Sequence, residues 1–357
     1  MKPLDLPPNV IDHFYRGGAR IGELRGFDPA NEFQPEEWLA AITARAGAGE
    51  IGLSRTTDGV LLRDIIAADR PSWIGTTAAP WGAGDNGLLV KLLDAGQRLP
   101  VHVHPDREFA ASHLGCPYGK TEAWFVLAVD PAAAAHDELG GDGPAVWLGW
   151  TEEVDPAEVS ARVEAQDSRW MLSRMHRIPV RPGDGILVPA GTAHAIGAGV
   201  FVAEVQEPTD QSILLEWSIT TSGREDSHLD LGFPTALQAL NHHQFDAAHV
   251  ASLCRHRDLA GRSPELTPLL PAAADPFFRL GMAAPTVGES VAVPAGFAVV
   301  VVLNGDGELA GQTETIEVSR GQVLAVPHAF GSWQVRGDVQ LLVCRPGLGW
   351  PETMVTP

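Results

Sequence analysis

Residues 183–194 read GDGILVPAGTAH, and their frame of glycine, apolar run and proline returns in residues 321–332, GQVLAVPHAFGS. In each copy the glycine opens a strand, the apolar run continues it, and the proline with a small residue turns the chain. We expect the last position of the frame to point inward, and this position is His194 in the first copy and Ser332 in the second. Two copies of this unit predict two β-barrels.

Most of the remaining chain consists of short apolar or β-branched runs that Gly, Pro and Asp separate, which is typical of an all-β sandwich or barrel. The predicted strands are Gly87–Leu93, Leu99–Val103, Ala123–Val129, Gly185–Pro189, Val200–Val205, Ser212–Ile219, Phe297–Leu303, Gln322–Val326 and Val339–Cys344. The predicted fold is therefore all-β, with two barrels or jelly rolls and a few helices.

Three segments have helical rather than strand patterns. Pro35–Ala46 spaces its apolar residues at helical intervals after two acidic residues, and Thr235–Leu253 carries an approximate apolar stripe. We expect a third helix over Pro156–Ala165.

The domain organisation follows from where strands are scarce. We expect an N-terminal, metal-binding barrel with helical segments over residues 1–230 and a helical connection over 231–265. Residues 266–357 would form a degenerate second barrel without metal. The total of 357 residues suits two domains of ordinary size.

The composition excludes several classes of protein. Hydrophobic residues make up 45% and charged residues 20%, as in ordinary globular chains rather than disordered or collagen-like ones. The formal net charge of -20 repels nucleic acid and acidic membranes, so we expect neither as a partner and expect a small molecule instead. The composition does not indicate an oligomeric state.

The cysteine pattern and the N-terminal segment predict a cytoplasmic location. Cys116, Cys254 and Cys344 lie far apart, which predicts neither a disulfide framework nor a cysteine zinc site. The first residues have no apolar stretch like that of a signal peptide, and the longest apolar run, Phe297–Leu303, is too short to span a bilayer.

One group of residues indicates a metal site. His102 and His104 alternate along a predicted strand, so their imidazoles project from the same face. Glu122 begins the next apolar run, and the turn of the repeated frame adds His194. Three imidazoles and one carboxylate suit a divalent ion such as Zn, Fe, Ni, Co or Mn. A paired His-x-His alone is commonly a surface feature, so the prediction depends on all four residues together.

Several ordered segments carry a family resemblance. They are Tyr15–Gly18, Leu88–Ala95, Leu99–Asp106, Gly119–Trp124, Val188–Gly197 and Glu204–Gln206. In these segments the chain resembles the type I mannose-6-phosphate isomerases of the cupin superfamily, and the likeness continues weakly into the second barrel. The resemblance implies a bicupin and a zinc-dependent isomerase that interconverts mannose 6-phosphate and fructose 6-phosphate. The family holds its metal with Gln, His, Glu and His, and those positions are His102, His104, Glu122 and His194 here.

Two positions depart from the family pattern. His102 replaces the usual glutamine, which could favour Fe, Ni or Co alongside Zn. Leu214 stands where the family has an active-site arginine, so the phosphate contact would be weakened or moved. The cations that could rim the barrel mouth instead are Arg16, Arg20, Lys91 and Arg107.

The expected catalytic residues are Lys120 and Glu204, and no residue suggests an organic cofactor. Lys120 would neutralise the enediolate, and Glu204 would shuttle protons or hold hydroxyls. The alternatives are a surface lysine and an ion-paired glutamate, and Glu207 and Asp210 stay undecided between the site and a loop.

Three other functions stay open: an isomerase of a non-phosphorylated or modified sugar, a non-catalytic sugar-binding bicupin, and a metal-dependent dioxygenase. The distance in sequence between the His-x-His pair and Glu122 weakens the dioxygenase.

Overall fold

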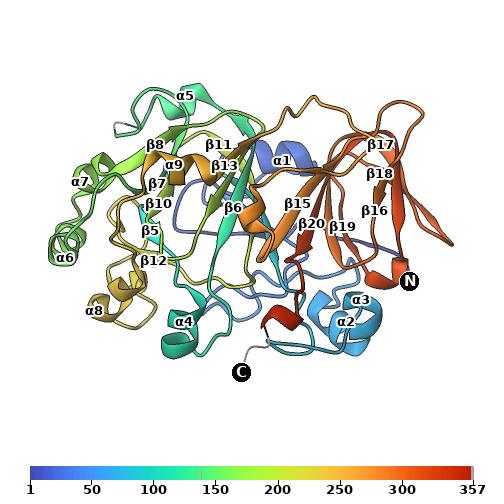
Figure 1. Ribbon diagram of the computed structural model, residues 1–357, viewed down its shortest axis with the longest axis horizontal. Coiled ribbons are helices and arrows are strands. Elements are labelled where there is room, and N and C mark those ends of the chain that lie inside the picture. Colours follow the sequence, from blue (N-terminus) through green and yellow to red (C-terminus); the bar gives the residue numbers. More distant parts are fainter. Residues whose placement is uncertain (138, 355–357) are drawn as a thin grey trace.

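The structure is a computed structural model that describes residues 1–137 and 139–354. Antiparallel strands form three sheets, and short helices lie around them (Figure 1). No helix in the described residues is long and apolar enough to cross a bilayer.

The first sheet has the strand order β13-β9-β6-β11-β4-β3-β2. Its strands are β2 (Val10–Ile11), β3 (Glu36–Leu39), β4 (Leu89–Asp94), β6 (Glu122–Val129), β9 (Asp184–Val188), β11 (Val200–Gln206) and β13 (Cys254–His256). On the central strand β11, Glu204 pairs with Lys91 of β4 on one side and Trp124 of β6 on the other. Side chains directly opposite one another share a face of the sheet, so this register collects charged groups on one surface.

The second sheet has the order β12-β5-β10-β7-β8. Its strands are β5 (His102–Val103), β7 (Ala145–Trp150), β8 (Met175–Pro179), β10 (His194–Ile196) and β12 (Ile213–Leu214). His194 lies directly opposite His102 across the β10–β5 pair, so strand pairing brings together two residues that are far apart in the sequence.

The third sheet contains the C-terminal strands and the first strand of the chain. Its strands are β1 (Leu4–Asp5), β14 (Thr267–Pro268), β15 (Phe278–Ala283), β16 (Val291–Val293), β17 (Ala298–Ala310), β18 (Thr315–Ser319), β19 (Val323–Val326) and β20 (Trp333–Pro346). Because β1 pairs with β19, the N-terminus lies against the C-terminal part of the chain (Figure 1).

The helices are short. They are α1 (Arg20–Arg25), α2 (Leu62–Ala68), α3 (Arg70–Ile74), α4 (Arg107–Phe109), α5 (Pro131–Ala134), α6 (Pro156–Glu164), α7 (Ser168–Ser173), α8 (Phe233–Ala236) and α9 (Ala247–Ser252). Helix α6 confirms the helix expected over Pro156–Ala165. Asp155 caps it by accepting from two backbone N–H groups of its first turn.

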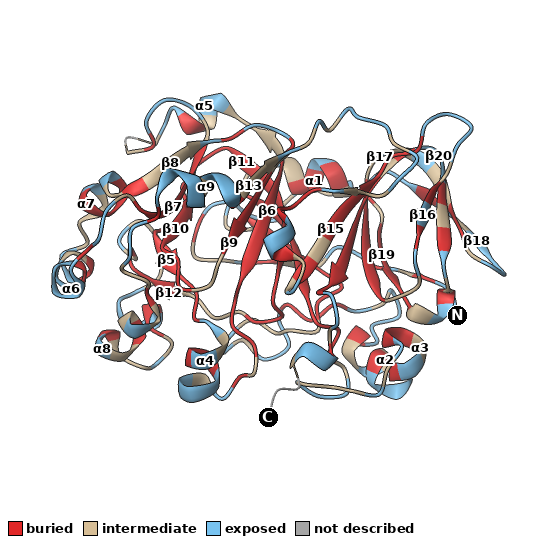
Figure 2. Cartoon of the chain, viewed as in Figure 1, coloured by how far each residue is buried: buried red, intermediate tan, exposed pale blue. Residues whose placement is uncertain are grey.

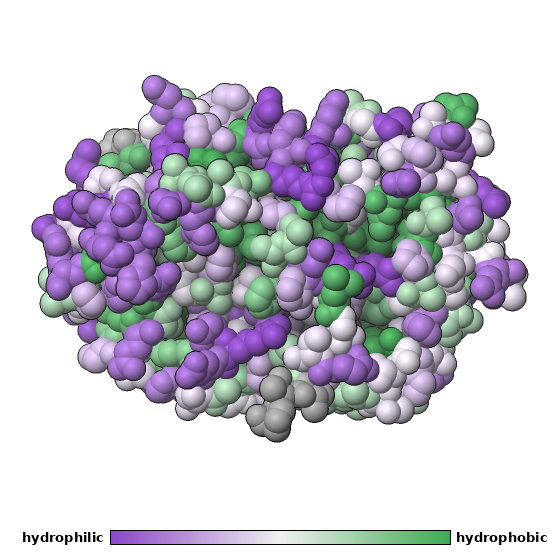
Figure 3. Space-filling view, viewed as in Figure 1, coloured by the Kyte–Doolittle hydropathy of each residue, from purple (hydrophilic) through white to green (hydrophobic). Residues whose placement is uncertain are grey.

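Buried side chains concentrate on the strands, and the peripheral helices show exposed faces (Figure 2). One apolar core contains Trp124 and Phe125 of the first sheet together with Phe278 and Cys344 of the third, so these two sheets share a core. Hydrophilic side chains cover the end of the molecule near α6 and α7, and apolar ones form separate patches on the face that Figure 3 shows.

The helix expected over Pro35–Ala46 is wrong, because strand β3 occupies Glu36–Leu39. All four residues of β3 are buried, and the strand pairs with β4. Glu37 forms a buried ion pair with Arg25, at 2.9 Å. Pairing within the sheet therefore outweighs the helical spacing of the apolar residues.

The continuous helix expected over Thr235–Leu253 is also wrong. Helix α8 and a three-ten turn end at Ala239, and α9 begins only at Ala247. Between them the backbone bonds elsewhere: Asn241 N donates to Gly191 O, and Phe245 N donates to Trp150 O. The segment between the two helices is thus hydrogen-bonded to the turn before β10 and to the end of β7.

The repeated frame has different geometry in its two copies. In the first, Gly191 adopts a left-handed conformation and His194 begins β10, fully buried. In the second, a three-ten turn follows β19 and Ser332 is exposed, so the expectation that Ser332 points inward is wrong. The three-ten turn changes which residue of the following segment faces the core, and Trp333 is buried there in place of Ser332.

The predicted strands are otherwise present with shifted bounds. Leu99–Val103 shortens to β5 and Ser212–Ile219 shortens to β12, whereas Phe297–Leu303 lengthens to β17 and Val339–Cys344 lengthens to β20.

Candidate metal centre and active site

Four buried side chains converge between the first two sheets: His102 of β5, His104 just after it, Glu122 of β6 and His194 of β10. One donor atom from each lies within 4.8 Å of the others. His104 Nε2 is 3.0 Å from Glu122 Oε2, and His194 Nε2 is 3.4 Å from Glu122 Oε1. The structure thus brings together all four residues of the predicted metal site.

Each of the three imidazoles is oriented by a backbone carbonyl. The carbonyls accept from Nδ1 of His102, His104 and His194 at 2.8, 2.9 and 2.7 Å, and they belong to Pro100, Gln211 and Thr192. A carbonyl can only accept, so Nδ1 carries the proton and Nε2 is left with its lone pair. This is the arrangement that orients metal-ligating histidines.

The donor set fits a metal ion on two further grounds. His194 Nε2 is buried and has no hydrogen-bond partner in the described part of the chain, although it is aimed at the cluster. Burial lowers the pKa of His104 to about 3 and that of His102 well below its ordinary value. Burial raises the pKa of Glu122, but Lys120 and His104 hold it well below its usual range. Neutral imidazoles and an ionised carboxylate are the forms that bind metal.

The structure places Lys120 beside the cluster rather than on the surface. Its Nζ lies 2.7 Å from Glu122 Oε2 and 2.7 Å from His104 Nε2. Its backbone N–H donates to Pro105 O, which ties the segment before β6 to the loop after β5. An ammonium group is therefore held next to the place where substrate oxygens would meet the cluster.

Glu204 projects from β11 onto the same surface. Its Oε1 lies 3.5 Å from Lys91 Nζ and has no hydrogen-bond partner in the described chain. Burial and the nearby Glu122 raise the pKa of Glu204 to about 7. Such a carboxylate can both accept and release a proton near neutral pH.

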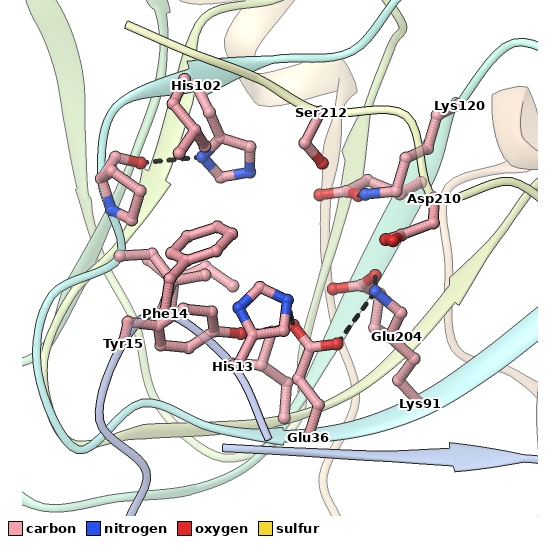
Figure 4. A pocket seen from close by; sticks show the side chains of 16 residues that line it. His13, Phe14, Tyr15, Glu36, Lys91, His102, Lys120, Glu204, Asp210 and Ser212 are labelled. Atoms are coloured by element: carbon pink, nitrogen blue, oxygen red, sulfur yellow. Dashed lines mark hydrogen bonds and ion pairs between the residues drawn. The ribbon is translucent and has the colours of Figure 1, made fainter. Parts of the chain in front are cut away.

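His102 and Glu122 of the cluster line a pocket of about 430 Å³, together with Lys120 and Glu204 (Figure 4). His102 lies across this pocket from Glu36 and Lys91. The other polar residues that line it are His13, Tyr15, Asp210 and Ser212.

Sequence reasoning missed the charge network on the floor of this pocket. Lys91 Nζ lies 3.2 Å from Glu36 Oε2, and the same carboxylate accepts from Trp38 Nε1 at 2.7 Å and from the Tyr15 hydroxyl. Burial lowers the pKa of Lys91, but Glu36 and Glu204 raise it above its usual value. The alternation of Glu36 and Trp38 could have revealed this network, had the segment been assigned as a strand.

The sequence left open whether Glu207 and Asp210 belong to the site or to a loop. Asp210 lines the pocket, and Glu207 does not. Glu207 accepts from Arg107 at 2.6 Å and from Thr121 N at 3.0 Å, so it fastens the loop before β6. Leu214, at the position of the family arginine, lines the pocket.

Of the proposed rim cations, only Lys91 lines the pocket. Arg16 is exposed and pairs with Glu32 at 3.0 Å, and Arg20 donates to Val129 O. Arg107 is held by Glu207 as described above.

No family model matches the chain. A mannose-6-phosphate isomerase of Streptococcus mutans is 28% identical over 331 residues, which cover 91% of this chain and 93% of that protein. A mannose-6-phosphate isomerase of Bacillus subtilis is 26% identical over 72% of this chain and 74% of its own length.

Solved structures show the same fold. The crystal structure of the mannose 6-phosphate isomerase from Bacillus subtilis has a TM-score of 0.73 at 21% identity and covers 97% of this chain and 100% of that one. A mannose 6-phosphate isomerase bound with zinc and yttrium has a TM-score of 0.69 at 15% identity and covers 98% of this chain and 100% of that one.

Proposed function

Because the chain belongs to the type I mannose-6-phosphate isomerase family, we propose that it is a metal-dependent aldose–ketose isomerase that interconverts mannose 6-phosphate and fructose 6-phosphate. The observation that carries the proposal is that the four-residue cluster reaches one pocket through His102 and Glu122, and that Lys120 and Glu204 line the same pocket. Fold alone would not identify the reaction, since one fold hosts many functions.

The proposed architecture is a bicupin. The first two sheets, which enclose the cluster, would form the metal-binding cupin of residues 1–230, and residues 231–265 would connect it to the degenerate cupin of residues 266–357. The described residues contain no second group of metal-ligating side chains, which supports a single metal site. Because β1 joins the third sheet, the N-terminus would tie the two cupins together. The free cysteines are compatible with the proposed cytoplasmic location.

His102, His104, Glu122 and His194 would hold one divalent ion, with zinc the first choice. When bound, the ion would supply a Lewis acid that polarises substrate oxygens. The remaining chemistry belongs to side chains of this pocket.

Isomerisation moves a proton between C2 and C1 of the open-chain sugar through an enediolate. Glu204, whose pKa of about 7 lets it exist in both forms, would remove the proton from one carbon and return it to the other. Lys120 would donate to the substrate oxygens and neutralise the charge that develops on them. Lys91 would position Glu204 through their 3.5 Å ion pair.

The second candidate is isomerisation of a non-phosphorylated sugar. Leu214 lines the pocket where the family has an arginine, and an apolar side chain cannot bind phosphate.

The test uses protein stripped of metal and then reloaded with zinc. We expect mannose 6-phosphate to yield fructose 6-phosphate only after reloading, and His194→Ala to stay inactive in the same zinc solution. Equal turnover by the stripped and the reloaded protein would contradict the proposal.

A further inference from the structure

The pocket opens into a wider cleft of about 1690 Å³. The two hollows share His13, Phe14, Asp210, Ser212 and Leu214, which therefore form a neck between them. A sugar whose C1 and C2 lie against Lys120 and Glu204 would extend its other end through this neck. The group at C6 would then lie at the neck or in the wider cleft.

Both lysines of the inner pocket already have anionic partners. Lys91 lies between Glu36 and Glu204, at 3.2 and 3.5 Å, and Lys120 donates to Glu122. The positive charges of both lysines are therefore already paired within the inner pocket.

Arg45 is the one arginine or lysine among the described residues that line the wider cleft. It lies on the loop that follows β3, and its Nη1 donates to the backbone carbonyl of Asp12. In the described chain it forms no ion pair with a carboxylate, and most of its guanidinium donors remain available. The positive charge of Arg45 acts on His13, which lies at the neck. Burial is the main cause that lowers the pKa of His13, Glu36 opposes it, and Arg45 lowers the pKa further.

The acidic residues of the cleft are largely engaged with the protein. Asp210 accepts from the backbone N–H of Ala46 at 3.0 Å, and burial raises its pKa. Glu225 pairs with Arg224 at 3.0 Å, and Asp226 accepts from the backbone of Gly223. Asp12 accepts from Asn31 and Gln34, and Asp230 also lines the cleft. Arg45 is the one arginine or lysine among the described lining residues, so its guanidinium is the group placed to bind an anion.

We infer that Arg45 binds the 6-phosphate of the substrate and sets the preference for phosphorylated sugars in place of the family arginine. This inference rests on the proposed function. A guanidinium can contact two phosphate oxygens at once, which a chain with a net charge of -20 needs in order to hold a dianion. Leu214 would pack against the sugar at the neck.

The test compares wild-type protein with Arg45→Gln, Arg45→Lys and a control, Arg16→Gln. Arg16 is exposed, pairs with Glu32 and lines neither hollow. For Arg45→Gln we expect kcat/KM for mannose 6-phosphate to fall roughly 10- to 100-fold, the loss of a charged hydrogen-bond partner, while any turnover of free mannose is unchanged. Arg45→Lys should lie between them, and Arg16→Gln should match the wild type.

Calorimetry provides a readout independent of turnover. Mannitol 1-phosphate cannot isomerise, and we expect its Kd for zinc-loaded protein to rise at least tenfold in Arg45→Gln and to recover in part in Arg45→Gln/Leu214→Arg. An unchanged Kd in Arg45→Gln, or equal losses on phosphorylated and free sugar, would overturn the inference. A wild-type protein that binds mannitol 1-phosphate but converts no mannose 6-phosphate would instead refute the proposed function.

Discussion

Replacing Lys91 by Met tests the buried charge network beneath the proposed catalytic base. At an effective dielectric constant of about 20, ion pairs of 3.2 and 3.5 Å, to Glu36 and Glu204, correspond to about 5 kcal/mol each. The cost of burying the three charges offsets most of this attraction. Methionine would leave two buried carboxylates without their ammonium, and we expect the free energy of unfolding to fall by about 3–5 kcal/mol.

The same substitution should move the pH profile. Burial and Glu122 raise the pKa of Glu204 to about 7, and Lys91 is the largest influence that lowers it. Without Lys91 the pKa of Glu204 should rise further, by about 1–3 units. Because the base acts in its ionised form, the acidic limb of kcat/KM should move to higher pH by the same amount.

Urea unfolding and pH-rate profiles of wild-type protein, Lys91→Met and Lys91→Met/Glu36→Gln provide the measurements. The double variant removes one of the stranded charges, so it should regain part of the lost stability. A stability loss below about 1 kcal/mol, or an acidic limb that stays in place or moves to lower pH, would refute the reasoning.

Three further predictions concern the metal, the catalytic residues and stability. Metal analysis should find about one divalent ion per chain, and His104→Ala or His194→Ala should lose it; two ions per chain would contradict a single site. Lys120→Ala and Glu204→Gln should keep the metal while kcat falls on the order of 10²–10⁴-fold, and full activity in both would remove them from the mechanism. Burial raises the pKa of Asp94 from 3.8 to about 6, so the folded protein binds the Asp94 proton more tightly than the unfolded chain does. The contribution of this group to the free energy of unfolding is therefore fully present below pH ~4 and is lost as the pH rises through 6. Asp94→Asn should therefore stabilise the protein by up to about 3 kcal/mol at pH 8 and by little at pH 4, and urea unfolding with equal effects at both pH values would count against this explanation.

The metal cluster could be predicted because its signals are local. The spacing of His102 and His104 places both side chains on one face of a strand, and the glycine and proline before His194 predict the turn there. Both features depend on neighbouring residues alone and not on contacts with distant segments. The charged network of Glu36 and Lys91 depends instead on a sheet register that forms between distant segments.

The predictions that were wrong also concern segments whose structure depends on contacts with distant residues. The helical pattern of Pro35–Ala46 is a local preference that pairing with β4 overrides, and the break before α9 reflects backbone bonds to Gly191 and Trp150. Ser332 shares its frame with His194 but not its conformation, because frame spacing does not determine whether a turn becomes three-ten helical. Arg45 lies on a loop that only the tertiary structure brings to the cleft.

The most direct test of the central claim is a comparison of substrates on zinc-loaded protein. The kcat/KM for mannose 6-phosphate should be measured beside that for free mannose, fructose and related aldoses, with fructose 6-phosphate identified as the product. We predict metal-dependent conversion of mannose 6-phosphate with a clear preference over free mannose. Conversion of free sugars with no turnover of mannose 6-phosphate would contradict the account.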